Sequence, residues 1–177
     1  MTYLALLRGI NVGGNNILPM KDLAKLFADA GCSNVRTYIQ SGNVVFDAPG
    51  KAPKIAKAVS ASIEKRFGYR APIILRTSQQ LRQTILDNPF LKVGVPEKML
   101  YVYFLADQPQ ANAIAGLDPN RSVPDVFQVL GQEIFLHLPN GAGKSKLTNA
   151  YFDSKLSTIC TARNWATVLK LAAMMEE

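Results

Sequence analysis

Apolar and polar positions alternate along the first half of the chain in a pattern typical of short strands and amphipathic helices. Apolar runs that end in glycine or in a turn predict strands, and apolar residues at helical spacing predict helices. The expected strands are residues 3–8, 34–40, 43–47 and 71–76, and the expected helices are residues 20–30 and 53–67. This order, strand-helix-strand-strand-helix-strand, is that of a ferredoxin-like unit.

The second half repeats much of the same order. A capped helix over residues 77–88 stops at Pro89, and a final helix over residues 164–175 has Thr161 as its expected cap. Between them, strands are expected at residues 98–106, 125–130 and 133–138, and helices at residues 108–117 and 147–156. The fold class is therefore α+β, with two ferredoxin-like units that have antiparallel sheets. A duplication is one interpretation, resting on element order alone, with domains at residues 1–90 and 91–177.

Both central strands are apolar on both faces. Neither face of residues 3–7 is polar, and residues 99–105 are apolar throughout, so helices should cover both sides of each sheet. RNA-recognition domains instead expose aromatic residues on an open sheet face. The segment 41–46 also lacks the basic and aromatic positions of those domains.

Composition indicates a globular protein of the cytoplasm. Hydrophobic residues make up 48% of the 177 positions, and no apolar run approaches the ~20 residues that span a bilayer. Residues 1–4 lack the basic region and cleavage site of a signal peptide. Cys32 and Cys160 lie far apart and are expected to be reduced thiols. We expect no membrane partner.

The positive charge is confined to one half of the chain. Residues 91–177 contain as many acidic as basic side chains, so the whole net charge of +7 lies in residues 1–90. Such a cluster attracts polyanions through counterion release, although it also suits the solvated face of a helix. Its members are Lys51, Lys54, Lys57, Lys65, Arg66, Arg70 and Arg76, with Glu64 as the one acid among them.

Polar segments with glycine follow two of the expected strands. Glycines let the backbone approach a ligand and present N–H groups to an anion, and an arginine fork suits phosphate or carboxylate. These residues could equally well shape a loop and a hairpin turn. The candidate ligand-binding residues here are Arg8, Gly9, Asn11, Gly13, Gly14, Ser41, Gly42 and Asn43.

A third glycine-bearing segment, residues 141–146, is close to a phosphate-binding P-loop. The motif fails because Leu138 stands where its first glycine is required, and no acidic residue is available to hold magnesium. A simpler anion nest that uses Lys144 and Lys146 is the alternative, and a basic surface turn is the plain interpretation.

The sequence offers little evidence of catalytic or metal-binding residues. His137 is the one histidine, and the strand pattern around it indicates a structural role. Zinc sites draw on clusters of Cys and His, so we expect no metal and no cofactor. Whether the protein is an enzyme stays open at this point.

Five stretches together resemble the signature stretches of a bacterial family known as domain of unknown function 1697 (DUF1697). They are Leu7–Gly14, Tyr38–Val44, Asn88–Phe90, Ser145–Leu147 and Thr161–Trp165, in that order along the chain. The resemblance implies a compact α+β protein of ferredoxin-like units with no established activity. Residues 161–165 are a polar segment in their own right, and Arg163 and Asn164 within it are further candidate ligand-binding residues.

Three functions remain open. The first is non-catalytic binding of a phosphate-bearing ligand, either nucleic acid or nucleotide-like, by the glycine loops and the basic half. The second is an enzyme acting on a phosphorylated or carboxylated metabolite, in a cleft where donors from all the segments converge. The third is a protein-interaction or structural module. The oligomeric state is not predicted.

Overall fold

The computed structural model describes all 177 residues, which form two compact units. The first unit comprises Met1–Arg82 and Leu171–Glu177, and the second comprises Gln83–Lys170. No helix is both long enough and apolar enough to cross a membrane. Each unit contains one four-stranded antiparallel sheet.

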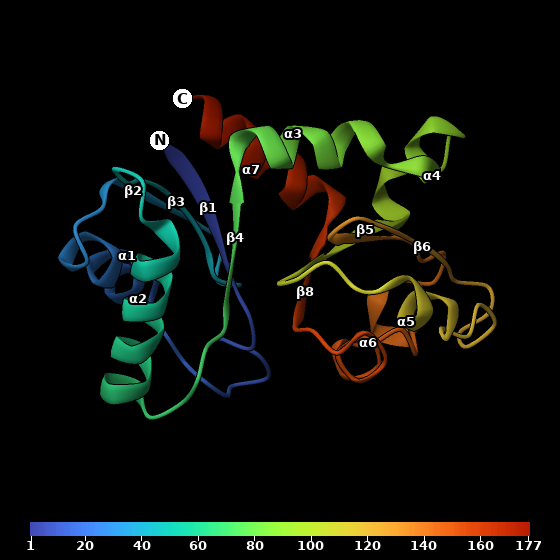
Figure 1. The fold of residues 1–177 in the computed structure, drawn as a ribbon, viewed down its shortest axis with the longest axis horizontal. Helices are drawn as coiled ribbons and strands as arrows, with labels where there is room; N and C mark the ends of the chain where they lie inside the picture. The colour runs from blue at the N-terminus through green and yellow to red at the C-terminus, as the bar shows by residue number, and fades with distance from the viewer. The chain divides into compact units, whose positions relative to one another are not determined.

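The first unit has the ferredoxin-like order expected from the sequence. Its strands lie in the order β2-β3-β1-β4, and every neighbouring pair is antiparallel. Helices α1 and α2 lie on one face of this sheet (Figure 1). The elements are β1 (Thr2–Leu7), α1 (Met20–Asp29), β2 (Ser33–Tyr38), β3 (Asn43–Asp47), α2 (Ala52–Phe67) and β4 (Ile73–Thr77).

Local signals set the bounds of α2. Pro53 lies in its first turn, where a missing N–H costs nothing, and Gly68 ends the helix in the left-handed conformation at φ 80°. Phe46 on β3 packs against the ring of Phe27 on α1, with centroids 4.9 Å apart. This contact joins the sheet to its helix layer in the core of the unit.

Both faces of the central strands β1 and β3 are buried. Ala5 and Val44 face the helices, whereas Leu4, Leu6 and Val45 lie on the other face and are also fully buried. The sequence prediction that these strands are covered on both sides is confirmed. The open sheet of an RNA-recognition domain is therefore absent from this unit.

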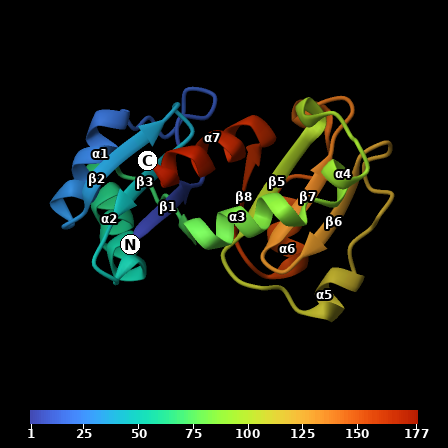
Figure 2. The same cartoon turned by 90° about the horizontal axis from the view of Figure 1, so that it is seen from above.

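The second unit repeats the topology. Its sheet has the order β6-β7-β5-β8, which matches the first sheet strand for strand (Figure 2). Helices α3 and α7 are each divided between the two units. The remaining elements are α3 (Ser78–Asp87), α4 (Pro89–Lys92), η1 (Glu97–Met99), β5 (Leu100–Leu105), α5 (Ala111–Ala115), β6 (Val126–Leu130), β7 (Glu133–His137), η2 (Ala142–Lys144), α6 (Asn149–Leu156), β8 (Cys160–Asn164) and α7 (Trp165–Glu176).

One strand was missed by the sequence prediction. Residues 160–164 form β8, which pairs with β5, and Thr161 is buried within it rather than capping a helix. The cap of α7 is Asn164, whose Oδ1 accepts a hydrogen bond from the backbone N–H of Thr167 at 2.8 Å. Strand β8 contains polar residues and passes into α7 without a turn, so no period-2 pattern or turn signal marks it. The domain division at residue 90 stays a prediction.

The two units also correspond residue by residue where β4 and β8 end. Arg76 and Arg163 are each the fourth residue of their strand, both are buried, and each guanidinium donates to the carbonyl of the preceding residue. The next residue caps the following helix in both units, since Thr77 accepts from the N–H of Gln80 as Asn164 does from Thr167. This match favours a duplication on grounds beyond element order.

Replacing Phe46 with alanine tests the core of the first unit. Phe46 is fully buried, so Phe46→Ala should lower the free energy of unfolding by about 3–5 kcal/mol, as core truncations of this size do. Urea unfolding followed by circular dichroism measures the loss. Val12→Ala in the same unit is the control and should change stability by less than about 0.5 kcal/mol, because Val12 is exposed. Equal effects of the two substitutions would contradict this core.

Candidate functional site

The glycine-rich loop that follows β1 is a small hairpin. The Asn11 N–H donates to the Asn16 carbonyl at 3.0 Å, and the Asn15 N–H donates to the Val12 carbonyl at 2.9 Å. Gly13 and Gly14 form its turn with φ values of 56° and 76°, which glycine adopts without strain. The loop therefore has a defined shape set by its own backbone.

The Asn11 side chain ties this loop to the hairpin turn between β2 and β3. Its Nδ2 donates to the Leu18 carbonyl at 3.0 Å and to the Gln40 carbonyl at 2.8 Å. Its Oδ1 accepts the Leu18 N–H at 2.7 Å. These three bonds engage both ends of the amide, so Asn11 serves the fold. The residues joined in this way, Asn11, Leu18 and Gln40, are called the Asn11 hub below.

The candidate residues in the hairpin turn are also engaged within the fold. Nδ2 of Asn43 donates to the Tyr38 carbonyl at 3.0 Å and to Ser41 Oγ at 2.9 Å. The Gly42 carbonyl accepts the Leu7 N–H at 2.8 Å. A Cβ on Gly42 would lie 2.7 Å from Leu7 Cβ, and its φ is 84°, so only glycine fits there. Ser41, Gly42 and Asn43 hold the turn against the end of β1.

Gly9, Gly13 and Gly14 are the candidate residues of this unit that are fully exposed, and Arg8 precedes the first of them. The Arg8 side chain is partly exposed, and its backbone N–H donates to the Pro72 carbonyl at 3.0 Å. The three glycines are exposed, with open space on the side where a Cβ would lie. The N–H groups of Gly13 and Gly14 donate no hydrogen bond within the protein. A ligand could therefore approach this backbone closely.

In the second unit, the segment around Lys144 and Lys146 is a surface turn held by its backbone. The Lys146 N–H donates to Ser122 Oγ at 2.9 Å, and its carbonyl accepts from Arg121 Nε at 3.0 Å. Both lysine side chains are exposed. Helix α6 begins only at Asn149, capped by Thr148, so no helix follows the glycines directly as in a P-loop.

Arg163 is placed as a framework residue. It is 7% exposed, and its Nη1 donates to Thr161 Oγ1 at 2.9 Å and to the Ala162 carbonyl at 2.7 Å. Burial lowers the pKa of its guanidinium to about 10. Asn164 is exposed, but its Oδ1 is used in capping α7. Sequence reasoning gave no sign of this burial because β8 had not been recognised.

The candidate residues thus divide between the units, eight in the first and four in the second. Those of the first unit gather at the end of its sheet where β1 stops, joined by the Asn11 hub. Those of the second unit lie after β7 and at the end of β8, where β5 begins. In the shared topology these are opposite ends of the sheet.

A row of lysines covers the solvent face of α2. The helix buries Ala52, Ala56, Val59 and Ile63, and at 100° per residue the opposite side carries lysines. All four are exposed, and none of their side chains forms an ion pair or hydrogen bond. We call this row, formed by Lys51, Lys54, Lys57 and Lys65, the lysine stripe.

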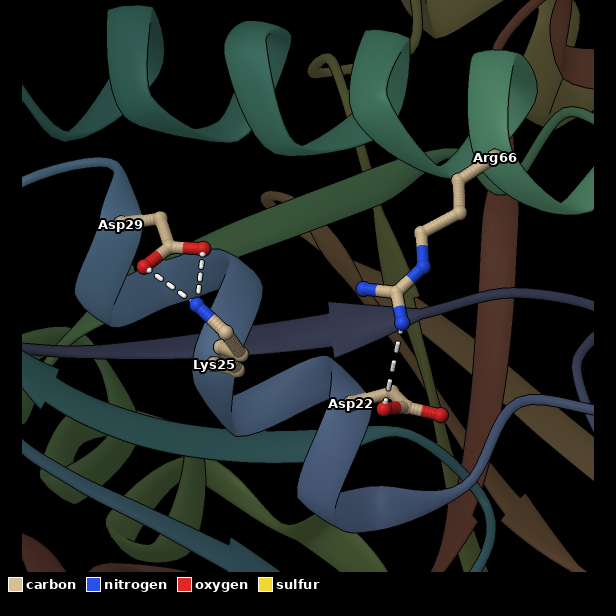
Figure 3. A network of polar contacts seen from close by, with 4 residues as sticks. All are labelled: Asp22, Lys25, Asp29 and Arg66. Atoms are coloured by element: carbon tan, nitrogen blue, oxygen red, sulfur yellow. Dashed lines mark hydrogen bonds and ion pairs between the residues drawn. The ribbon is translucent and has the colours of Figure 1, made fainter.

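Three neighbouring cations, Lys25, Arg66 and Arg70, are each paired with an acid, unlike the lysine stripe. Arg66 on α2 lies 3.6 Å from Asp22 on α1, and Lys25 lies 2.8 Å from Asp29 within α1 (Figure 3). Arg70 lies 3.2 Å from Glu64. Asp22, Asp29 and Glu64 thus pair with other cations and leave the lysine stripe uncompensated.

Two further features bear on the choice of function. An open hollow of about 560 Å³ in the second unit is lined by Asp107, Gln108, Asn112, Thr158 and their neighbours. Thr158 Oγ1 donates to the Asp107 carboxylate at 3.3 Å and accepts the Asp107 backbone N–H at 3.1 Å. His137 lies elsewhere, with its ring 6.0 Å from that of Phe90. No group of three or more His, Cys, Asp or Glu residues is placed to hold a metal ion.

Comparisons with known proteins identify a family and a fold. A family model described as a protein of unknown function, DUF1697, matches residues 1–135. The solved structure of the conserved bacterial protein SP0830 from Streptococcus pneumoniae aligns with a TM-score of 0.77 at 18% identity, covering 99% of this chain and 98% of that chain. At that identity the likeness concerns the fold alone. No curated protein matches the chain.

A pair of glycine substitutions separates the framework of this site from its surface. Gly42→Ala meets both a steric contact and a left-handed φ, so it should lower the free energy of unfolding by about 2–5 kcal/mol. Gly13→Ala meets open space and should lose about 1–2 kcal/mol from its φ alone. Chemical denaturation of both variants provides the comparison. An equal loss in the two would show that the Gly42 contact is unimportant.

Proposed function

The chain belongs to the DUF1697 family, and we propose that its first unit binds a phosphate-bearing polyanion, a nucleic-acid strand, without catalysing a reaction. The lysine stripe on α2 is the observation that carries this proposal. The glycine hairpin and Arg8 form the second part of the surface.

The stripe is long enough to follow the phosphate backbone of a nucleic-acid strand over several nucleotides. From Ala52, the residue after Lys51, to Lys65 the helix rises about 20 Å, which is on the order of six phosphates of one strand at duplex spacing. Lysine acts on phosphate as a point charge and needs no fixed geometry. Such a row suits sequence-independent contact with a strand.

The same lysines repel one another in the absence of a ligand. Lys54 and Lys57 are three residues apart on one helix face, where like charges destabilise by about 0.2–0.5 kcal/mol. No acid offsets this repulsion. A bound polyanion would relieve it and would release the counterions condensed on its own phosphates.

The C-terminal end of α2 brings the stripe to the glycine hairpin. The Tyr69 hydroxyl, just after the helix, donates to the Ile17 carbonyl at 3.3 Å. Arg66 and Asp22 join the end of α2 to the beginning of α1, which follows the hairpin. The unbonded N–H groups of Gly13 and Gly14 thus extend the cationic surface at this end. Asn11, Ser41, Gly42 and Asn43 support the surface by holding the fold of this unit.

Removing two charges from the stripe tests the proposal. Lys54→Ala with Lys57→Ala should weaken binding of a labelled single-stranded oligonucleotide and lower the slope of log K against log salt by about 1.4, because each lost phosphate contact contributes about 0.7. Fluorescence anisotropy across a salt series measures both quantities. Circular dichroism should show an unchanged fold, since both side chains are exposed.

A charge-matched control lies in the second unit. Lys155 and Lys170 are exposed helix lysines without an ion pair, so Lys155→Ala with Lys170→Ala removes the same charge from another place. This variant should keep the wild-type salt slope. Equal losses in both double variants would mean that net charge alone drives binding. Absence of binding by the wild-type protein at low salt would rule out the proposal.

A further inference from the structure

Three large apolar side chains are exposed together at the end of the first unit where the glycine hairpin meets the β2–β3 turn. Val12 is 62% exposed, Ile17 is 64% exposed and Ile39 is 49% exposed. Val12 and Ile17 belong to the hairpin loop, and Ile39 belongs to the turn. We call these three side chains the apolar tip.

The Asn11 hub holds the apolar tip together. Val12 follows Asn11, Ile17 precedes Leu18, and Ile39 precedes Gln40 in the sequence. The three hydrogen bonds of the Asn11 amide join their neighbours directly, at 2.7–3.0 Å. The tip is therefore built on a fixed support, although it is formed by segments far apart in the chain.

Ile39 occupies its position at a conformational cost. Its φ is 49°, in the left-handed region, where a β-branched residue is a marked outlier. Asparagine or glycine would adopt this conformation more easily, and a polar residue would suit an exposed position better. An exposed, strained isoleucine beside two exposed apolar residues is typical of a contact surface.

Cationic and aromatic groups border the tip. The Tyr69 hydroxyl lies against the backbone of Ile17, and Arg70 follows Tyr69 with a largely exposed side chain. Arg8 lies at the other end of the loop, and the lysine stripe approaches along α2. An apolar surface near the unpaired lysines of the stripe complements a ligand that is both anionic and apolar.

We propose that the apolar tip contacts the unstacked bases of a single nucleic-acid strand whose phosphates lie along the lysine stripe. This inference rests on the proposed function and names its ligand class. A single strand offers base faces to apolar side chains and phosphates to lysines, whereas a duplex conceals its base faces in the stack. Single-stranded ligands are therefore preferred over duplex.

Three ligands of equal length and label separate phosphate contact from base contact. They are a single-stranded oligothymidylate, an abasic strand with the same phosphates, and a duplex. Wild-type protein should bind the oligothymidylate about 5- to 20-fold more tightly than the abasic strand at the same salt concentration. Val12→Ser with Ile17→Ser should reduce that ratio to about one and leave the salt slope unchanged.

Ile39→Asn tests the tip with a substitution that should not destabilise the fold. Asparagine accepts the left-handed φ of this position, so the melting temperature should stay the same or rise. Binding of the oligothymidylate should nonetheless weaken, with the affinity for the abasic strand unchanged. A lower melting temperature, or equal weakening for both ligands, would contradict the role given to Ile39.

The outcomes distinguish this inference from the proposed function. If the wild-type protein binds all three ligands equally and with a steep salt dependence, polyanion binding stands and the base contact is overturned. If it binds none of them, both fail. If the tip variants lose binding to vesicles of anionic phospholipid while the oligothymidylate ratio is unchanged, the tip contacts lipid and the inference is wrong.

Discussion

Burial of the central strands on both faces is the constraint on which the rest of the molecule depends. In the first unit Leu4 and Ala5 point to opposite faces of β1, and both are inaccessible to solvent. In the second unit Val102 and Tyr103 of β5 show the same pattern. A sheet covered on both sides has no face left for a ligand. Functional groups are therefore restricted to the ends of strands, to the edge strands β2 and β6, and to the solvent faces of helices.

The positions of the acidic side chains determine which cations on the surface of the first unit remain unpaired. Asp22, Asp29 and Glu64 each lie close to a cation other than the lysines of the stripe. Exposed ion pairs of this kind contribute at most about 1 kcal/mol to stability, so the pairing is not required for folding. Its consequence is electrostatic, since it leaves the positive potential of the unit concentrated along α2.

The sequence was sufficient for most of the fold because apolar periodicity and turn residues are local signals. They located α2, with Pro53 at its beginning and Gly68 at its end, and both hairpins. They failed at β8, where Arg163 and Thr161 are buried although polar, and where the helix follows without a turn. A burial that depends on strand pairing far along the chain leaves no local pattern to read.

The candidate site was only partly accessible from the sequence, and for a related reason. Residue type indicated that Asn11 and Arg8 could both bind an anion, but the amide of Asn11 is consumed by three internal bonds. Among the twelve glycines, Gly42 has no room for a side chain because Leu7, which lies 35 positions earlier in the chain, occupies the space. No pattern pointed to Ile39, because its strain and exposure exist only once the turn is formed.

These distinctions separate two kinds of residue within the signature stretches of the family. A polar side chain whose hydrogen bonds are all made inside the protein stabilises the folded state, and replacing it leaves a buried group unpaired at about 1–3 kcal/mol. An exposed backbone N–H without a partner, such as that of Gly13, adds nothing to folding. The strain at Ile39 goes further, since it opposes folding by about 1–2 kcal/mol. An exposed N–H group that the fold does not use, and a strained residue that the fold tolerates at a cost, are more simply explained by selection for binding than by selection for stability. In this unit both lie at the end of β1.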